Sequence, residues 1–344
     1  MNESTEAEAS VALELWVLLD FVDEMELGKE SGYVDYTTRS MLRTYLYMLV
    51  KRIKGFKSLA KHLELKPEVR KRLGLKSCPH RTTLSRRFKE IPEVVREQIR
   101  QLHGYFVSEG VTRAEVMSGD SSLMNAQGNV WHKKQMEQGE LPSCGNIDKE
   151  AHWGVSGCKK WVYGYRIHCL VSAASEAALP CDVEVEPANI KDAQVFKEEL
   201  IHSIPEQTKV VLADGGFDDQ SCYELCDQKG VSLIAPIKVK KSTPPERVER
   251  AKLYHDPEVR ELFSLRKTTV EPFQGRLKAL FELEHLFMKG HKNVRALVLL
   301  ASLAYLLLAK LNFLLGFDIL KLQDTSLLSY QMILAHLIAI QIFY

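Results

Sequence analysis

Apolar residues in the first third of the chain recur at the three- and four-residue spacing of amphipathic helices. In the stretch that begins at Thr37, the residues Met41, Tyr45, Met48, Leu49 and Ile53 recur at this spacing. We therefore predict an all-α region. Its other predicted helices cover residues 11–21, 56–63, 68–73 and 92–107, together with a helix in the basic sequence RTTLSRRFKE that Thr82 or Thr83 caps.

Beyond residue 111 the pattern changes to short apolar runs and alternations that are typical of β-strands. Five strands are predicted, at residues 114–124, 160–174, 179–189, 209–215 and 231–237. Amphipathic helices at residues 192–204 and 220–229 separate the last three strands. Three consecutive strands followed by helix, strand, helix and strand predict a mixed α/β sheet with right-handed crossovers. A loop rich in lysine and proline then leads into charged helical sequence that runs to about residue 278.

The C-terminal region is strongly apolar. Residues 296–309 are bounded by Arg295 and Lys310, and fourteen residues are too few to cross a bilayer, so we predict a buried helix. Residues 325–344 contain no Lys, Arg, Asp or Glu, but Ser, Gln and His interrupt them. A packed terminal helix is the prediction for this end, and a membrane tail anchor is the alternative.

These patterns predict four regions along the chain. Residues 1–36 form an acidic segment with a short helix, and residues 37–108 form a basic all-α region. Residues 109–290 form the α/β domain, and residues 291–344 form apolar helices that pack on its core.

A net charge of +1 conceals a strong segregation of charge. The first 36 residues hold ten acids and one base, whereas residues 37–100 hold eighteen Lys and Arg and five Glu. Such a basic module is expected of nucleic-acid binders, although a solvated helical surface has the same composition. The candidate DNA-binding surface consists of Arg81, Arg86, Arg87 and Lys89, with the basic run at residues 70–72.

The seven cysteines indicate a reduced, cytoplasmic protein. Their number is odd, and the acidic start of the chain lacks the basic region of a signal peptide. The cysteines show no pair-of-pairs spacing, so the sequence does not predict a zinc site.

Three acids stand at positions suited to phosphodiester chemistry. Asp120 lies on the first predicted strand, Asp214 ends the fourth just before two glycines, and Glu271 lies in charged helical sequence. Such chemistry needs an activated oxygen nucleophile and neutralisation of the transferring phosphoryl group, which Mg²⁺ held by a few carboxylates provides. Any one of these acids, taken alone, is more typical of a turn, a helix cap or the surface, and only the three together favour a functional site. The bases around Glu271 are Arg266, Lys267, Arg276 and Lys278.

Four stretches of the chain resemble the DDE transposases of bacterial and archaeal insertion sequences, close to insertion-sequence family four. They are GDSSLM with the first acid, DKEAHWGVSGCKKWVYGYRIHCLVSA, PCDVEVEPANIKDAQVF, and VVLADGGFDD with the second acid. The run FSLRKTTVEPFQGRLK is similar to the Tyr, Arg, Glu and Lys signature around that family's third acid. The resemblance covers about residues 114–278, and the helical first third also resembles the group's N-terminal region.

The resemblance implies an RNase H-like, retroviral-integrase-like catalytic domain with a five-stranded mixed sheet. It implies a DNA transposase that cleaves element ends and transfers them to target DNA with Mg²⁺ or Mn²⁺, two ions per site. Asp120, Asp214 and Glu271 would be the catalytic, metal-binding triad, and Arg266 and Lys278 would lie near the DNA. The implied partners are double-stranded DNA, at terminal inverted repeats and at the target, and a second copy of the chain in a nucleoid-associated complex.

The third signature departs from the family pattern at two points. Phe263 stands where the family has Tyr, and four residues rather than three separate Arg266 from Glu271. Lys267 restores the spacing and is the alternative base at that position. These departures leave two other functions open: a transposase-derived DNA-binding protein without catalysis, and a metal-dependent nuclease.

The remaining candidates have simpler interpretations. Trp131, Trp153 and Trp161 lie in or beside the loop between the first two strands, where they either pack or stack on an unpaired base. Asp218 and Asp219 follow the two glycines after Asp214, and we predict turn and helix-capping roles for them.

Overall fold

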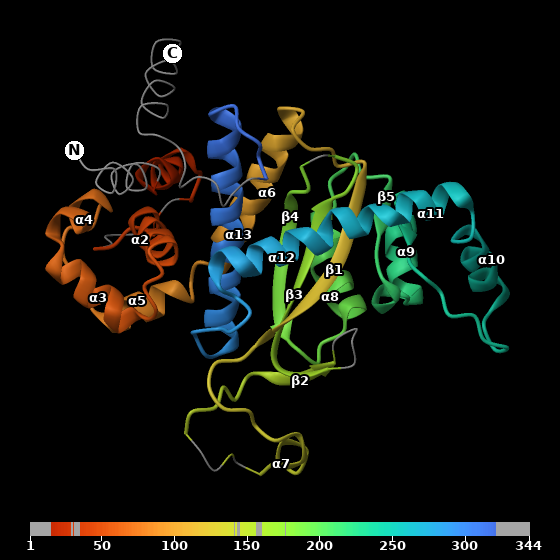
Figure 1. The fold of residues 1–344 in the computed structure, drawn as a ribbon, viewed down its shortest axis with the longest axis horizontal. Coiled ribbons are helices and arrows are strands. Elements are labelled where there is room, and N and C mark those ends of the chain that lie inside the picture. The colour runs from red at the N-terminus through yellow and green to blue at the C-terminus, as the bar shows by residue number, and fades with distance from the viewer. Residues whose placement is uncertain are drawn as a thin grey trace. The chain divides into compact units, whose positions relative to one another are not determined.

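The structure is a computed structural model, and it describes residues 15–28, 30, 35–140, 142, 145–155, 160–175 and 177–320 (Figure 1). The helix predicted at residues 325–344 lies outside the described residues, as does the beginning of the one predicted at 11–21. By its internal contacts the chain divides into two compact units. One consists of Met1–Gln98 with Leu300–Tyr344, and the other of Ile99–Leu299.

The first unit is helical, as predicted. Tyr45 and Phe88 form part of its buried core, where their rings make an edge-to-face contact. The Tyr45 hydroxyl also donates a hydrogen bond to the carbonyl of Leu84 at 2.7 Å. The elements are η1 (Phe21–Glu24), α2 (Thr38–Val50), α3 (Phe56–Leu65), α4 (Pro67–Arg72), α5 (Arg81–Phe88) and the start of α6 (Pro92–Ser108).

The prediction that Thr82 or Thr83 caps α5 was wrong. The helix begins at Arg81, and the ring of His80 accepts a hydrogen bond from the backbone N–H of Thr82. A neutral imidazole nitrogen can serve as the acceptor that a hydroxyl or carboxylate usually provides at this position. By contrast, α2 has a common cap, because the Thr37 side chain accepts from the N–H of Ser40.

The second unit contains a mixed β-sheet. Its strands are β1 (Val116–Asn125), β2 (His152–Val155), β3 (Trp161–Ser172), β4 (Pro180–Pro187), β5 (Val210–Leu212) and β6 (Ser232–Ile234). The order is β2-β3-β1-β5-β6, and β4 also pairs with β3. β3 runs antiparallel to β1, β2 and β4, whereas β1, β5 and β6 are parallel.

All five predicted strands are confirmed, within a few residues at each end. β2 was not predicted, because its four residues are too few to show an alternating pattern. The strand exists because β3 extends beyond Tyr165, where its pairing with β4 ends, and so leaves an edge on which Val155 lies opposite Trp161.

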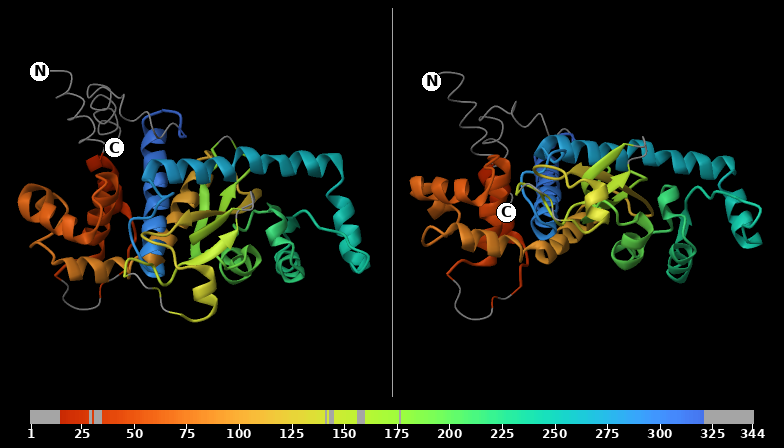
Figure 2. Two further views of the ribbon diagram at one scale, coloured as in Figure 1. Left: turned by 60° about the horizontal axis from the view of Figure 1, so that its bottom comes forward. Right: turned by 90° about the horizontal axis from the view of Figure 1, so that it is seen from below.

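Helices cover both faces of the sheet. α8 (Asp192–Glu198), η2 (Leu200–Ser203) and α9 (Gln220–Gln228) lie on one face, and α12 (Val270–Phe281) crosses the other (Figure 2). A buried cluster that includes Met117, Phe196, Phe217 and Tyr223 fills the space between the sheet and α8 and α9. The remaining elements of this unit are α7 (Lys133–Glu137), η3 (Gly215–Phe217), α10 (Pro245–Leu253), α11 (Pro257–Ser264) and η4 (Leu265–Thr268).

The predicted apolar C-terminal helix is present but longer than expected. It is α13 (His291–Leu314), which is 24 residues long, so the bounds predicted from Arg295 and Lys310 were wrong. Both charged residues lie within the helix and are paired: Arg295 Nη2 lies 2.8 Å from Glu184, and Lys310 Nζ lies 2.6 Å from Glu24. By length and composition alone α13 could span a membrane, but 78% of its most apolar segment is buried in the protein, as expected of a core helix.

Candidate active site

The parallel pairing of β1 with β5 brings two of the predicted acids together. Ser118 lies opposite Leu212, and continuing this register by two residues places Asp120 level with Asp214. Asp120 and its neighbour Gly119 point to opposite faces of the sheet, because side chains alternate along a strand. A Cβ on Gly119 would contact Phe217 in the cluster beneath α8 and α9, so Asp120 points to the face that α12 crosses.

The pKa of Asp120 is set by neighbours that act in opposite directions. Burial raises its pKa, the Arg266 guanidinium and the backbone N–H of Ser121 lower it, and the carboxylates of Asp214 and Asp192 raise it again. The net result is a pKa of about 6. Burial therefore outweighs the ion pair with Arg266, and the nearby carboxylate of Asp214 adds to this effect; we call Asp120 and Asp214 the acidic group.

Asp214 is both a cap and a member of this acidic group. Its Oδ1 accepts a 2.7 Å hydrogen bond from the N–H of Gly216 and so begins η3. Asp214 therefore does cap η3, as one interpretation of the sequence predicted. The cap uses only Oδ1, and it fixes the orientation of the carboxylate. The following acids have the roles predicted for them: Asp219 caps α9 through the N–H of Ser221, and Asp218 pairs with Arg247.

Of the two candidate bases before Glu271, only Arg266 reaches the acidic group. It is 8% exposed, and its Nη2 lies 3.2 Å from Asp120 Oδ1. The ring of Phe263, at the position where the family signature has Tyr, lies 5.3 Å from the guanidinium carbon. Lys267 is exposed on η4. The short η4 turn therefore directs Arg266, and not Lys267, toward Asp120.

Glu271 lies in the first turn of α12, on the same face of the sheet as Asp120. It is exposed and borders a pocket of about 460 Å³. The other residues that line this pocket are Ser122, Gln274, Gly275, Lys278, Ala279 and Glu284. Ser122 is two residues beyond Asp120 on β1 and so lies on the same face. Within the described part of the chain, however, no three His, Cys, Asp or Glu side chains are close enough to bind one metal ion.

Two polar contacts hold α12 on the sheet. Gln274 Nε2 donates to Cys169 Sγ at 3.2 Å, and Cys169 lies opposite Asp120 in the β1–β3 register. Lys278 Nζ donates to the carbonyl of Leu123 at 2.6 Å and also lies 3.2 Å from Glu284. Lys278 thus points toward the strand, whereas Arg276, two residues earlier, is half-buried.

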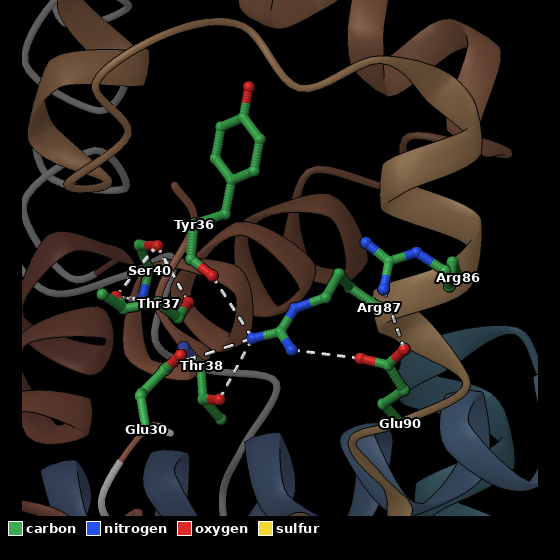
Figure 3. A network of polar contacts seen from close by, with 8 residues as sticks. All are labelled: Glu30, Tyr36, Thr37, Thr38, Ser40, Arg86, Arg87 and Glu90. Carbon is green, nitrogen blue, oxygen red and sulfur yellow. Dashed lines mark hydrogen bonds and ion pairs between the residues drawn. The ribbon is translucent and has the colours of Figure 1, made fainter. Parts of the chain in front are cut away.

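The three basic residues predicted on α5 differ in their surroundings. Arg81 is exposed, and the exposed Arg86 pairs with Glu90 at 3.3 Å. Arg87 turns inward and joins α5 to the segment before α2 (Figure 3). Its contacts are the carbonyl of Tyr36 at 3.3 Å, the hydroxyl of Thr38 at 3.2 Å, Glu90 at 3.0 Å and Glu30 at 3.9 Å.

The predicted tryptophans also separate into two groups. The indole N–H of Trp131 donates to the carbonyl of Glu140, and that of Trp153, on β2, donates to the carbonyl of Trp131. Both side chains therefore make hydrogen bonds within the protein. Trp161 is 54% exposed, with Lys133 Nζ 4.0 Å above its ring. The five cysteines in the described residues form no disulfide with one another.

Sequence reasoning missed one acid, Asp192, which affects the charge around Asp120. It begins α8 and contacts Arg166 and His168 on β3. The alternation along β3 places Arg166 and His168 on one face, and this was the available signal. The crossing of α8 above that face could not be read from the pattern.

Comparison with known families identifies the chain. The family model for the transposase DDE domain matches residues 113–307, which include every element of the sheet as well as α12. The chain belongs to the DDE transposase family. The sheet order β4-β3-β1-β5-β6, with helices on both faces, a helical N-terminal region and a C-terminal helix, is the RNase H-like transposase fold that was predicted.

Solved transposase structures show only a distant likeness to this DDE transposase. A piggyBac transposase synaptic complex with hairpin DNA is 9% identical, with a TM-score of 0.39, over 96% of this chain and 79% of that one. A pre-cleavage Mos1 transpososome is 9% identical, with a TM-score of 0.21, over 85% of this chain and 84% of that one. No curated protein matches the chain in sequence. The family assignment therefore rests on the domain match.

DDE transposases use divalent metal ions, and the donor chemistry of this chain suits them. The carboxylate oxygens of Asp120 and Asp214 are hard ligands of the kind that Mg²⁺ and Mn²⁺ prefer. The raised pKa of Asp120 reflects burial together with neighbouring negative charge, both of which a bound cation would offset. Glu271 borders the adjoining pocket rather than joining the other two acids.

Proposed function

We propose that this chain is a DNA transposase of the insertion-sequence type, related to insertion-sequence family four, which performs cut-and-paste transposition. It would cleave DNA at element ends and join the exposed 3′-hydroxyl to a target phosphodiester. The observation that carries this proposal is the pairing of β1 with β5, which sets Asp120 beside Asp214 on the face where α12 presents Glu271.

In this proposal Asp120, Asp214 and Glu271 hold divalent cations. When bound, such ions activate water or a 3′-hydroxyl and neutralise charge on the phosphoryl group. Arg266 has a planar guanidinium that already meets one carboxylate, so it is suited to hold a DNA phosphate next to the acids. Lys267 and Arg276 would contact the DNA backbone near Glu271, and Lys278 would keep α12 seated on β1.

The exposed side of α5 supports a DNA-binding role for the N-terminal unit. Arg81, Arg86 and Lys89 are exposed there, and contacts to phosphates from such residues provide affinity and register. Arg87 would take no part, because its guanidinium is engaged inside the unit. We propose that two copies of the chain assemble on two DNA ends.

The test is a strand-transfer assay with the DNA that flanks the reading frame, where this function requires inverted repeats. The purified chain is incubated with a labelled end fragment and a supercoiled target plasmid, with Mg²⁺, Mn²⁺ or EDTA. Nicking at the repeat followed by covalent joining to the plasmid, in metal only, is the expected result. Binding of end DNA without nicking in either metal would instead favour a non-catalytic DNA-binding protein. Nicking without joining would favour a nuclease.

A further inference from the structure

Asp192 is a buried acid with an unusual concentration of partners. Arg166 Nη1 lies 3.3 and 3.4 Å from its two carboxylate oxygens, and His168 Nδ1 lies 3.2 Å from Oδ1. The hydroxyl of Ser121 also interacts with Asp192 and accepts from Arg166 at 3.1 Å. We call Ser121, Arg166 and His168 the Asp192 cradle.

The cradle keeps Asp192 ionised. Burial by itself would raise the pKa of Asp192, but His168, Ser121 and Arg166 together bring that pKa below its ordinary value. The cradle residues belong to the two strands at the predicted site: Ser121 follows Asp120 on β1, and Arg166 and His168 lie on β3. Asp192 therefore links α8 to both strands from the face opposite α12.

The other side of Asp192 faces the turn that carries Asp214. A Cβ added to Gly216 would lie 2.5 Å from Asp192 Oδ2 and 2.9 Å from Asp214 Oδ1. The backbone of Gly216 thus lies between the two carboxylates, and its N–H donates to Asp214. Gly216 has no positive φ angle, so a methyl group at this position would act by displacing one or both of these carboxylates rather than by straining the backbone. A Cβ added to Gly215, the preceding residue, would lie 3.6 Å from the carbonyl oxygen of Pro236, which is an ordinary van der Waals contact.

We infer that Asp192 is a positioning residue that sets the location of Asp214 relative to Asp120. It anchors α8 to β1 and β3 through the cradle and supports the Gly216 turn from below. It contacts neither DNA nor the reacting atoms. Loss of its charge would release Arg166 and His168 and let the turn move, which changes how Asp120 and Asp214 together bind a cation. This inference rests on the proposed function of these two acids.

The experiment compares two matched pairs of variants in the full chain. Asp192→Asn is matched by Asp219→Asn, since Asp219 is also an acid at the start of a helix, with Lys197 as its partner at 3.2 Å. Gly216→Ala is matched by Gly215→Ala in the same turn. Mn²⁺ affinity is measured without DNA by isothermal titration calorimetry, end-DNA affinity by fluorescence anisotropy, folding by thermal unfolding, and cleavage with saturating end DNA.

We expect Asp192→Asn and Gly216→Ala to weaken Mn²⁺ binding and slow cleavage by about 10- to 100-fold, as for other residues that orient metal ligands. End-DNA affinity should stay unchanged, and the two control variants should match the wild type. The inference is overturned if folded Asp192→Asn and Gly216→Ala retain wild-type Mn²⁺ affinity, or if the controls lose as much. If Asp192→Asn does not fold, Gly216→Ala alone decides. A wild-type chain that neither binds Mn²⁺ nor cleaves DNA would refute the proposed function itself. Failure of the proposed function is thus seen in the wild type, whereas failure of the Asp192 inference is seen only in the variants.

Discussion

The properties of Asp120 depend on neighbours that are remote in the sequence. Burial raises its pKa, Arg266 from η4 lowers it, and Asp214 after β5 and Asp192 on α8 raise it again. An isolated aspartate on a strand would have none of these influences. Ionising Asp120 in the folded protein is unfavourable because burial outweighs its ion pair with Arg266, and a bound cation would offset that cost.

The raised pKa of Asp120 predicts a pH-dependent stability in metal-free solution. Its ordinary pKa of 3.8 applies to the unfolded chain, whereas that in the folded protein is about 6. The stability that Asp120 contributes is therefore fully present below pH 3.8 and is lost as the pH rises through 6, up to about 3 kcal/mol. Asp120→Asn cannot ionise, so it should gain stability relative to the wild type between roughly pH 4 and pH 7. Urea unfolding in EDTA measures this, and a pH-independent difference would contradict it.

The three predicted acids should be individually essential for catalysis. We expect Asp120→Ala, Asp214→Ala and Glu271→Ala each to reduce metal-dependent cleavage on the order of 100-fold or more, with end-DNA binding retained. Asp227→Ala provides the control, because this exposed acid on α9 pairs only with Arg250 among the contacts described. A variant that cleaves at the wild-type rate would remove its residue from the triad.

Arg266 and Lys267 should behave differently when each is replaced by Ala. Arg266→Ala removes the cation next to Asp120, so we expect cleavage to fall by about 100-fold. Lys267→Ala removes an exposed charge and should only weaken DNA binding, with the salt dependence of log K reduced by about one unit. Cleavage rates and salt titrations of end-DNA binding test both. Equal loss of cleavage in the two variants would show that the spacing of the family signature, rather than the ion pair, identifies the base.

At the scale of elements, α5 shows how one short helix directs some basic residues to the surface and another into the protein. Leu84 and Phe88 are buried, which fixes the rotation of the helix about its axis. That rotation leaves Arg81 and Arg86 exposed and turns Arg87 toward Tyr36 and Thr38 (Figure 3). Adjacent arginines therefore acquire different roles, because successive helical residues point about 100° apart.

This division makes a prediction for α5. Arg87→Ala breaks several charge-assisted hydrogen bonds at once, and we expect it to lower the free energy of unfolding by about 2 kcal/mol. Arg81→Ala should leave thermal stability unchanged and weaken end-DNA binding, more strongly at low salt. Thermal unfolding and fluorescence anisotropy distinguish the two. Weaker DNA binding by a fully stable Arg87→Ala would mean that Arg87 is available to DNA after all.

At the scale of the whole molecule, the chain combines an RNase H-like unit with a helical unit, and α6 and α13 contribute residues to both. The net charge of +1 is too small to draw the whole molecule to DNA. In the proposed function, DNA binding would therefore depend on local basic surfaces, such as that of Arg81 and Arg86 on α5 with Lys89 just after it. Such local charge supports specific contacts near the DNA and little long-range attraction in salt.

Transposition of an element requires both of its ends to be cut and joined together. We therefore expect the chain to bind end DNA as an assembly of two chains and two DNA ends. Analytical ultracentrifugation with labelled DNA measures this stoichiometry, and the free chain serves as the control. A stable complex of one chain and one end that completes strand transfer would contradict the prediction.

Local patterns in the sequence were sufficient to predict most of the fold. Alternating apolar residues located the five main strands, and three- and four-residue spacing located the helices, since burial of one face imposes these periods. The sequence did not predict β2, because a four-residue strand has too little pattern. It also misplaced the ends of α13, because Arg295 and Lys310 lie within the helix and are paired with Glu184 and Glu24 instead of marking its ends.

The sequence by itself determined which acids to consider, namely Asp120, Asp214 and Glu271, and which family the chain resembles. Only the tertiary structure decided which side chains meet. It brought Arg266 rather than Lys267 to Asp120, turned Arg87 inward, and placed Asp192 under the Gly216 turn. The reason is physical: periodicity along the chain determines the type of an element and its buried face. Contacts between distant residues depend on strand order, on register and on how each helix crosses the sheet.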